Sequence, residues 1–261
     1  MKRALDIAIP VLLALALLAL WEAVVRLREI PPYVLPAPSA IAAALCANGS
    51  SLAAAMASTL LITVKGFLGA LFAAVLLAIL FSQSRLAEKA LYPYAVILQV
   101  TPVVAIAPLI LIWVGFERID IALALIAGII AFFPILASAV QGLKSADFNL
   151  LDLARLYGAT KLQTLWRIQL PAALPGLLTG MKTGAVIALI GEVTAEFAAG
   201  SGTASGLAWR IAEAGNRLEI ATLFAAVALL CATGVLLFAL LSLLEWALLR
   251  RWHESAIARQ L

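Results

Sequence analysis

The sequence has little charge, one histidine and very little cysteine. Lysine and arginine contribute 18 residues and aspartate and glutamate 14, so that 12% of the 261 residues are charged. In a soluble globular domain roughly a quarter of the residues are charged and about half are apolar. Because 65% of this chain is hydrophobic, it has too little polar surface for a water-soluble monomer. The composition therefore predicts a membrane protein.

The scarcity of reactive side chains also bears on function. The single histidine, His253, lies in the C-terminal tail, which argues against histidine-based catalysis within the membrane. The two cysteines, Cys46 and Cys231, lie far apart and form neither a metal motif nor a redox motif. We attribute the net charge of +4 to loop charges that set membrane orientation and not to nucleic-acid binding. We therefore expect no bound metal, no cofactor on this chain and no nucleic acid partner.

Apolar runs extend from one end of the chain to the other. Each is long enough to cross a hydrocarbon core about 30 Å thick, and each is predicted to be a helix because lipid cannot satisfy backbone polar groups. We therefore predict a single all-α polytopic membrane domain over residues 1–261. Its core covers residues 55–250, and lipid surrounds it. The six predicted spans cover residues 4–25, 58–81, 91–113, 119–141, 174–198 and 220–249.

The basic residues predict the orientation of these spans. With the N-terminus in the cytoplasm, the larger group of lysines and arginines falls on the cytoplasmic side, in agreement with the positive-inside rule. Both termini and the long loop 142–173 are then cytoplasmic. The inside group is Lys2, Arg3, Arg85, Lys89, Lys144, Arg155, Lys161, Arg167, Arg250, Arg251 and Arg259, and the outside group is Arg26, Arg28, Arg118, Arg210 and Arg217.

The third predicted span contains Pro93, Pro102 and Pro108. Proline removes a backbone donor and bends a helix, and such a bend is tolerated where neighbours or a cavity satisfy the backbone. Two interpretations stay open, a bent helix beside a transport path and a kink that serves packing alone.

The loop 142–173 contains a predicted elbow of two short helices at residues 149–172. Residues 150–157 give two amphipathic turns, which Gly158 is expected to end. Thr160 can cap a second helix over residues 161–168.

The second helix of the elbow has an apolar face. Leu162, Leu165 and Trp166 are predicted to lie on it, outside the bilayer and therefore without lipid to contact. An apolar patch in that position indicates a protein partner.

The elbow resembles the cytoplasmic signature of permeases in binding-protein-dependent ATP-binding-cassette (ABC) importers. Asp152-Leu153-Ala154 matches the start of that signature, Gly158 its glycine and Ile168-Gln169-Leu170-Pro171 its end, with the same spacing throughout. Asp152 stands where glutamate is commonest and Leu153 where alanine is commonest, and both departures keep the charge pattern and the helix. The resemblance implies that the elbow docks into a groove of a cytoplasmic ATPase subunit. The implied coupling residues are Asp152, Leu153, Ala154, Gly158, Leu162, Leu165, Trp166, Ile168, Leu170 and Pro171.

Further segments resemble, in the same order, the nitrate, sulfonate and taurine branch of these permeases, which includes permeases for thiamine-precursor pyrimidines and riboflavin. The resemblance implies a non-catalytic type I importer permease in the bacterial cytoplasmic (inner) membrane, with ATP and Mg²⁺ on a partner ATPase dimer. It also implies a second permease subunit, as a homodimer, and a periplasmic or lipid-anchored substrate-binding protein. The matching segments are Leu35–Ser39, Thr59–Phe67, Thr101–Gly115 and Gly191–Glu196.

A few charged residues fall inside the predicted spans. Glu192 and Glu196 share a helix face in the outer half of the fifth span, and intramembrane carboxylates usually face a bundle interior or a water-filled path. We expect both to line an outer gate, whereas a solvated Glu196 is the alternative. Lys182 is expected to snorkel, and Lys65 either meets an acidic partner or lines the path. The expected translocation path thus involves Glu196, Glu192, Lys65 and Pro102.

Two functions of other classes remain as alternatives. An ion-coupled secondary transporter would have internal repeats and broken helices in matching halves, and an intramembrane enzyme would have a nucleophile with a base at membrane depth. The sequence gives no clear sign of either. The glycine-rich loop at residues 200–206 lacks the lysine of a P-loop, so it predicts no nucleotide site.

Overall fold

The computed structural model describes residues 2–200 and 205–250, and it confirms a helical chain, without a strand in those residues. His253, Arg251, Arg259 and most of the glycine-rich loop at 200–206 lie outside the described residues. The helices are α1 (Lys2–Leu27), α2 (Pro38–Ala47), α3 (Gly49–Gln83), α4 (Arg85–Val100), α5 (Val103–Val114), the 3₁₀ turn η1 (Phe116–Arg118), α6 (Ile119–Lys144), α7 (Phe148–Leu156), α8 (Lys161–Thr164), the π-helical turn η2 (Leu165–Gln169), α9 (Leu170–Ala199), α10 (Leu207–Asn216) and α11 (Ile220–Leu249).

Five helical segments are long and apolar enough to cross a membrane, and a sixth crossing results if α4 and α5 count as one broken span. The predicted spans at 119–141, 174–198 and 220–249 lie within α6, α9 and α11. α3 begins well before residue 58, since serine and alanine residues extend the helix on that side. The prediction of about six spans is therefore confirmed, although one of them is not a single helix.

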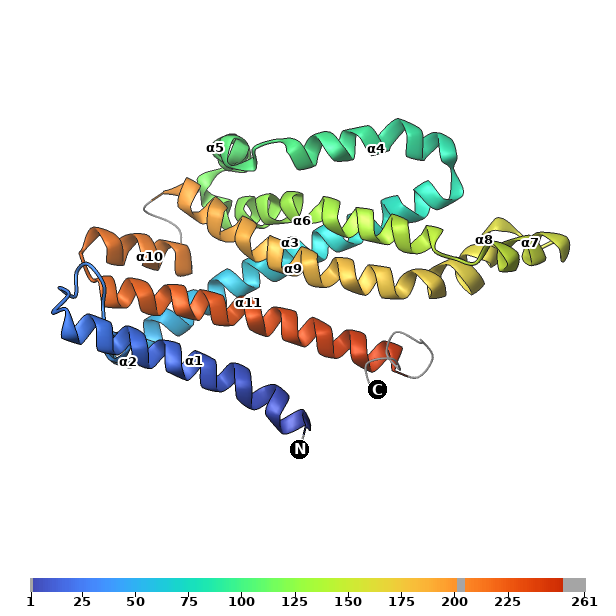
Figure 1. The fold of residues 1–261 in the computed structure, drawn as a ribbon. Coiled ribbons are helices and arrows are strands. Elements are labelled where there is room, and N and C mark those ends of the chain that lie inside the picture. Colours follow the sequence, from blue (N-terminus) through green and yellow to red (C-terminus); the bar gives the residue numbers. More distant parts are fainter. Residues whose placement is uncertain (1, 201–204, 251–261) are drawn as a thin grey trace. The chain divides into compact units, whose positions relative to one another are not determined.

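The third predicted span, 91–113, is wrong as a continuous helix. α4 ends at Val100 and α5 begins at Val103, and their axes differ by 99°. Figure 1 shows α5 turned out of the line of α4. The break lies at Pro102, because a proline disfavours helical geometry in the residue before it, and Thr101 is extended with ψ at 127°. Pro93 and Pro108 lie inside α4 and α5, so only one of the three prolines breaks the span.

The chain divides into two compact units, so that α3 and α11 each contribute residues to both. The first unit comprises residues 1–58 and 205–232, and the second comprises residues 59–204 and 233–261. The predicted single permease domain stays a prediction beside this division. Buried residues from α3, α10 and α11 form the core of the first unit: Leu52, Ala55, Leu207, Ala225 and Ala226.

Within the first unit, a hydrogen-bonded cluster joins α1 to the start of α2. The Glu22 carboxylate accepts hydrogen bonds from the backbone N–H of Ser39 at 3.0 Å and from its hydroxyl at 2.8 Å. Arg26, one helical turn after Glu22, pairs with the same carboxylate at 2.6 Å. These contacts fix the turn between the two helices.

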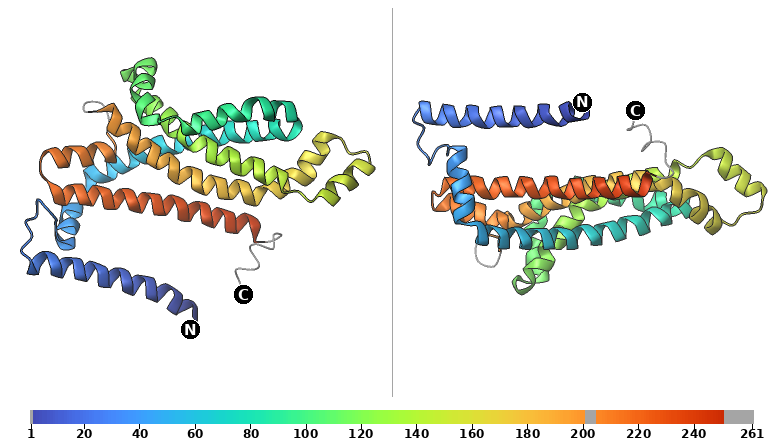
Figure 2. Two further views of the ribbon diagram at one scale, coloured as in Figure 1. Left: turned by 45° about the horizontal axis from the view of Figure 1, so that its top comes forward. Right: turned by 90° about the horizontal axis from the view of Figure 1, so that it is seen from below.

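Within the second unit, α6 and α9 form the most extensive helix pair, and they run side by side in Figures 1 and 2. Glycines permit this close approach. A Cβ built on Gly142 would lie 2.8 Å from the carbonyl oxygen of Ala173, and one on Gly180 would lie 2.6 Å from the Cβ of Ser138. Side chains at these positions would force the two helices apart, so the small residues set the interhelical distance.

Lys182 also lies within the second unit, and it does not snorkel as expected. Its ammonium group lies 2.5 Å from the carboxylate of Glu245 on α11, and both side chains are largely buried. The Phe238 ring lies 5.8 Å from the same ammonium group. The buried Lys182 ammonium group is thus paired with a carboxylate, as is usual for charged side chains within a membrane, where an unpaired charge is costly.

Candidate functional site

The predicted elbow is present as α7, α8 and η2, and it follows directly from the end of α6. The Asp147 side chain caps α7 by accepting a hydrogen bond from the backbone N–H of Asn149 at 2.8 Å. The predicted stop at Gly158 is confirmed, because Gly158 has a left-handed φ of +71° that glycine adopts readily. Beyond that turn, the backbone N–H of Ala159 donates to the carbonyl of Ala154 at 2.9 Å. The glycine therefore closes α7 and reverses the chain.

Thr160 caps the second helix, as predicted. Its side chain accepts a hydrogen bond from the backbone N–H of Gln163, while the Gln163 side chain accepts one from the backbone N–H of Thr160 at 2.8 Å. This reciprocal arrangement is a capping box. The helix does not end at residue 168, however, since α8 passes through η2 into α9 without an interruption. Pro171 lies near the start of α9, directly after the π-helical turn η2.

The predicted apolar face of the second helix is correct for two of its three residues. Leu162 and Trp166 are 63% and 66% exposed. Leu165 is only 3% exposed and belongs to the core of the second unit, so its place on an exposed face was wrong. The physical reason is helical geometry, because Leu165 points toward α6 and α9 while its neighbours point away. Leu165 therefore anchors the elbow to the helices behind it.

α7 exposes more apolar surface than the sequence prediction had assigned. Leu153, Leu156 and Tyr157 are all exposed, and the latter two were not among the predicted coupling residues. Their spacing on an amphipathic helix could have identified them. Figure 1 shows α7 and α8 projecting beyond the end of α6, so these side chains lie apart from the helical core of their unit.

The remaining predicted coupling residues lie around this surface. Asp152 and Arg155 form an exposed ion pair at 2.8 Å on α7. Ala154 is half-buried on the same helix. Ile168, Leu170 and Pro171 are half-buried where the elbow joins α9.

Glu192 and Glu196 both face the protein interior from α9, and they share a helix face as predicted. They are 0% and 3% exposed, so Glu196 is not solvated, which was the alternative. Neither oxygen of Glu192 has a hydrogen-bond partner within the described part of the chain. A buried carboxylate without a partner is costly and commonly marks a functional position.

Lys65 lies on α3 at a cavity of about 470 Å³ that belongs to the second unit. Asp120 lines the same cavity, as do Gly66, Gly69 and Gly128. No ion pair joins Lys65 to Asp120 in the described residues. Pro102, the fourth predicted path residue, is exposed at the break between α4 and α5. Glu192, Glu196 and Pro102 do not line the Lys65 cavity.

These features define a helical, multi-pass membrane protein with an exposed apolar elbow. The chain belongs to the binding-protein-dependent transport system inner membrane component family, whose profile matches residues 66–252. It is 36% identical to the riboflavin transport system permease protein of Chloroflexus aurantiacus, over 95% of this chain and 91% of that protein. It is 29% identical to the putative aliphatic sulfonates transport permease protein of Bacillus subtilis, over 94% of this chain and 87% of that protein.

The fold is similar to that of a solved structure as well. An amino acid ABC transporter crystallised with histidines matches with a TM-score of 0.63, over 77% of this chain and 95% of that chain, at 16% sequence identity. The comparisons confirm an ABC transporter permease of the predicted branch and an all-α, multi-pass membrane fold. Members of this family are transport subunits and are not themselves catalytic.

Proposed function

We propose that this chain is the membrane-spanning permease of an ATP-driven importer, in which the elbow transmits the motion of a cytoplasmic ATPase dimer to the membrane helices. ATP and Mg²⁺ are bound by that ATPase, and this chain binds no cofactor. Two copies of the chain form the permease. Both chain ends and the elbow lie in the cytoplasm.

The apolar surface of the elbow is the observation that carries this proposal. Leu153, Leu156, Tyr157, Leu162 and Trp166 are exposed on α7, α8 and η2. They lie beyond the apolar part of α6 and α9, so lipid does not cover them. Exposed apolar surface of this kind favours a protein partner.

Transport follows by alternating access. When ATP closes the ATPase dimer, the two elbows move with it and the permease opens outward to receive solute from a substrate-binding protein. Hydrolysis then resets the inward-facing state. Glu192 and Glu196 belong to the outer gate, since both carboxylates are buried on one face of α9. The Glu192 carboxylate, which has no hydrogen-bond partner in the described residues, is stabilised when a rearrangement brings it a partner or water. We assign Lys65, beside its cavity, and Pro102, at the break between α4 and α5, to the same path.

The solute is a small polar molecule. The solutes of related permeases support a sulfonate or taurine-like anion, or a riboflavin-type or pyrimidine vitamin precursor, and the resemblance to this branch adds a nitrate-like anion. The substrate-binding protein makes the choice among these, since it delivers the solute to the permease.

Substitution of one exposed leucine tests the elbow as the docking surface. The tagged full chain is purified from cells that contain its ATPase, and the amount of ATPase that co-purifies is measured. Leu162→Asp places a charge on the docking surface, and loss of a hot-spot contact, at about 2 kcal/mol, weakens an interface by about thirtyfold. We expect the ATPase to be lost from the preparation.

Leu218→Asp is the matched control. Leu218 is exposed to a similar extent, 72% against 63%, but it precedes α11 on the predicted outer side. This variant should retain the ATPase. Equal ATPase recovery with both variants, at equal yields of folded chain, would refute the docking role of the elbow.

A further inference from the structure

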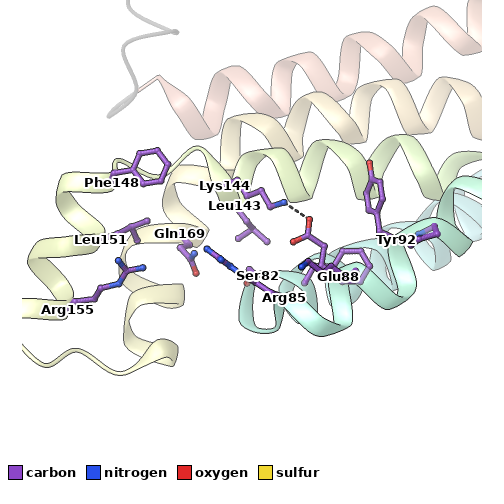
Figure 3. A pocket seen from close by; sticks show the side chains of 13 residues that line it. Ser82, Arg85, Glu88, Tyr92, Leu143, Lys144, Phe148, Leu151, Arg155 and Gln169 are labelled. Carbon is purple, nitrogen blue, oxygen red and sulfur yellow. Dashed lines mark hydrogen bonds and ion pairs between the residues drawn. The ribbon is translucent and has the colours of Figure 1, made fainter.

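A cavity of about 760 Å³ lies where α3 ends, α4 begins, α6 ends and α7 begins, all within the second unit. Figure 3 shows its side chains converging from these elements. The apolar parts of α4 and α6 end at this level, so the cavity lies at the boundary between the membrane helices and the elbow. None of the predicted coupling or path residues lines it.

The lining carries an excess of positive charge. Arg85, Lys89, Lys144 and Arg155 line the cavity, against one carboxylate, that of Glu88. Glu88 forms an ion pair with Lys144, shown by the dashed line in Figure 3.

The other basic side chains of the cavity have few acidic partners. Arg155 pairs with Asp152 at the exposed surface of α7. Arg85 and Lys89 have no ion pair within the described residues. A recess lined by one sign of charge concentrates the electrostatic field and attracts an ion of the opposite sign. The cavity therefore favours an anion.

The two arginines are placed to hold that anion from both sides. Figure 3 shows the Arg85 side chain extending from the start of α4 and the Arg155 side chain from α7. Both also line an adjoining cavity of about 550 Å³, together with Lys161 and Thr164. Guanidinium groups bind phosphate through paired N–H donors, which gives both strength and orientation.

The rest of the cavity wall is apolar. Phe81, Tyr92 and Pro93 line it on the side of α3 and α4, and Leu143 and Phe148 line it on the side of α6 and α7. A free phosphate ion would make no use of such a wall. A molecule that combines a phosphate with an acyl chain would contact both parts, and basic recesses between membrane helices on the cytoplasmic side are typical of anionic lipid sites.

We propose that this cavity binds the headgroup of an anionic phospholipid, with the phosphate between Arg85 and Arg155 and the acyl chains along Tyr92 and Pro93. The lipid would then join α4 to the elbow, because one arginine comes from each. Anionic lipid thereby becomes a structural component of the coupling region. This role is separate from solute transport itself and from ATPase docking.

Lipid retention on the purified full chain tests the proposal. The chain is equilibrated in detergent micelles that contain equal parts phosphatidylglycerol and phosphatidylcholine, and native mass spectrometry measures the lipids that remain bound. We expect the wild type to retain phosphatidylglycerol selectively. Each basic side chain near a membrane surface contributes about a fivefold increase in affinity for anionic lipid, so Arg85→Ala/Arg155→Ala should lower it about twenty-five-fold.

Two further variants serve as controls. Arg118→Ala/Arg217→Ala removes two exposed arginines that do not line the cavity and should retain the lipid. Arg85→Lys/Arg155→Lys keeps both charges and should show a smaller loss, which keeps the test informative if the alanine pair does not fold.

Three results would overturn the proposal. Equal loss in the two alanine pairs would mean that the cavity is not the site, and equal retention of the two lipids by the wild type would mean that no selective site exists. Displacement of phosphatidylglycerol by an equal concentration of inorganic phosphate would mean that the occupant is a soluble anion.

Discussion

Leu162 and Leu165 lie three residues apart on the elbow, yet one is exposed and the other is buried against α6 and α9. Hydropathy gives the same prediction for both, and the direction of each side chain decides between them. The apolar character of the segment could be predicted from the sequence. The anchoring role of Leu165 could not be predicted, because it depends on which face of α8 and η2 packs against the rest of the second unit.

The residue scale also includes the backbone of Gly158. Its φ of +71° is left-handed, and no atom lies within 4 Å of a Cβ built on it. Gly158→Ala would therefore have no steric clash with neighbours, and its effect would come from the backbone conformation alone, at about 1–2 kcal/mol. We expect the α7 and α8 amides to exchange hydrogen about five to thirty times faster.

Gly158→Asn is the control for that prediction, since asparagine tolerates the left-handed region better than alanine does. Its exchange rates should lie between those of the wild type and Gly158→Ala. Unchanged exchange in Gly158→Ala would mean that the turn does not depend on this conformation.

At the scale of helices, the seam between α6 and α9 is set by small residues. In Gly142→Ala the new Cβ would meet the carbonyl oxygen and Cα of Ala173 at 2.8 and 3.1 Å. Backbone atoms cannot rotate away as a side chain can, so the helices must separate. We expect the free energy of unfolding to fall by about 1–3 kcal/mol, measured as a lower melting temperature in detergent.

Gly69→Ala is the matched control on α3, because a Cβ there has no atom within 4 Å. The same substitution in a helix interior should leave the protein as stable or raise its stability by up to about 1 kcal/mol. If Gly142→Ala were as stable as Gly69→Ala, the close packing of α6 against α9 would not be what holds the pair together.

The helix boundaries illustrate what periodicity and hydropathy can and cannot predict. Pro102 was correctly among the candidates for a bend. Pro93 and Pro108 were equally good candidates from the sequence, yet both lie inside intact helices. The 99° turn occurs where Thr101, directly before Pro102, adopts an extended conformation, whereas Tyr92 before Pro93 and Ala107 before Pro108 stay helical. Likewise, Glu245 could not be named as the partner of Lys182, since the two lie on different helices 63 residues apart.

At the scale of the whole molecule, the membrane class and the family followed from composition, six apolar runs and one spaced motif. The assignment to an ABC permease rests on residues 66–252 and on relatives that align with nearly the entire chain. The cavity between α4 and α7 could not be predicted, because Arg85 and Arg155 lie 70 residues apart in a sequence whose loops contain many basic residues. Tertiary structure alone brings them to one recess.

The most direct test of the proposed function is solute uptake by proteoliposomes containing the chain with its co-purified ATPase and binding protein. Taurine, an aliphatic sulfonate, riboflavin and a formylaminopyrimidine serve as the tested solutes, with and without ATP. We expect at least one solute to accumulate only when ATP, the ATPase and the binding protein are all present, and we expect Leu162→Asp to abolish this uptake. Accumulation of a solute by the chain alone, without ATP, would contradict it.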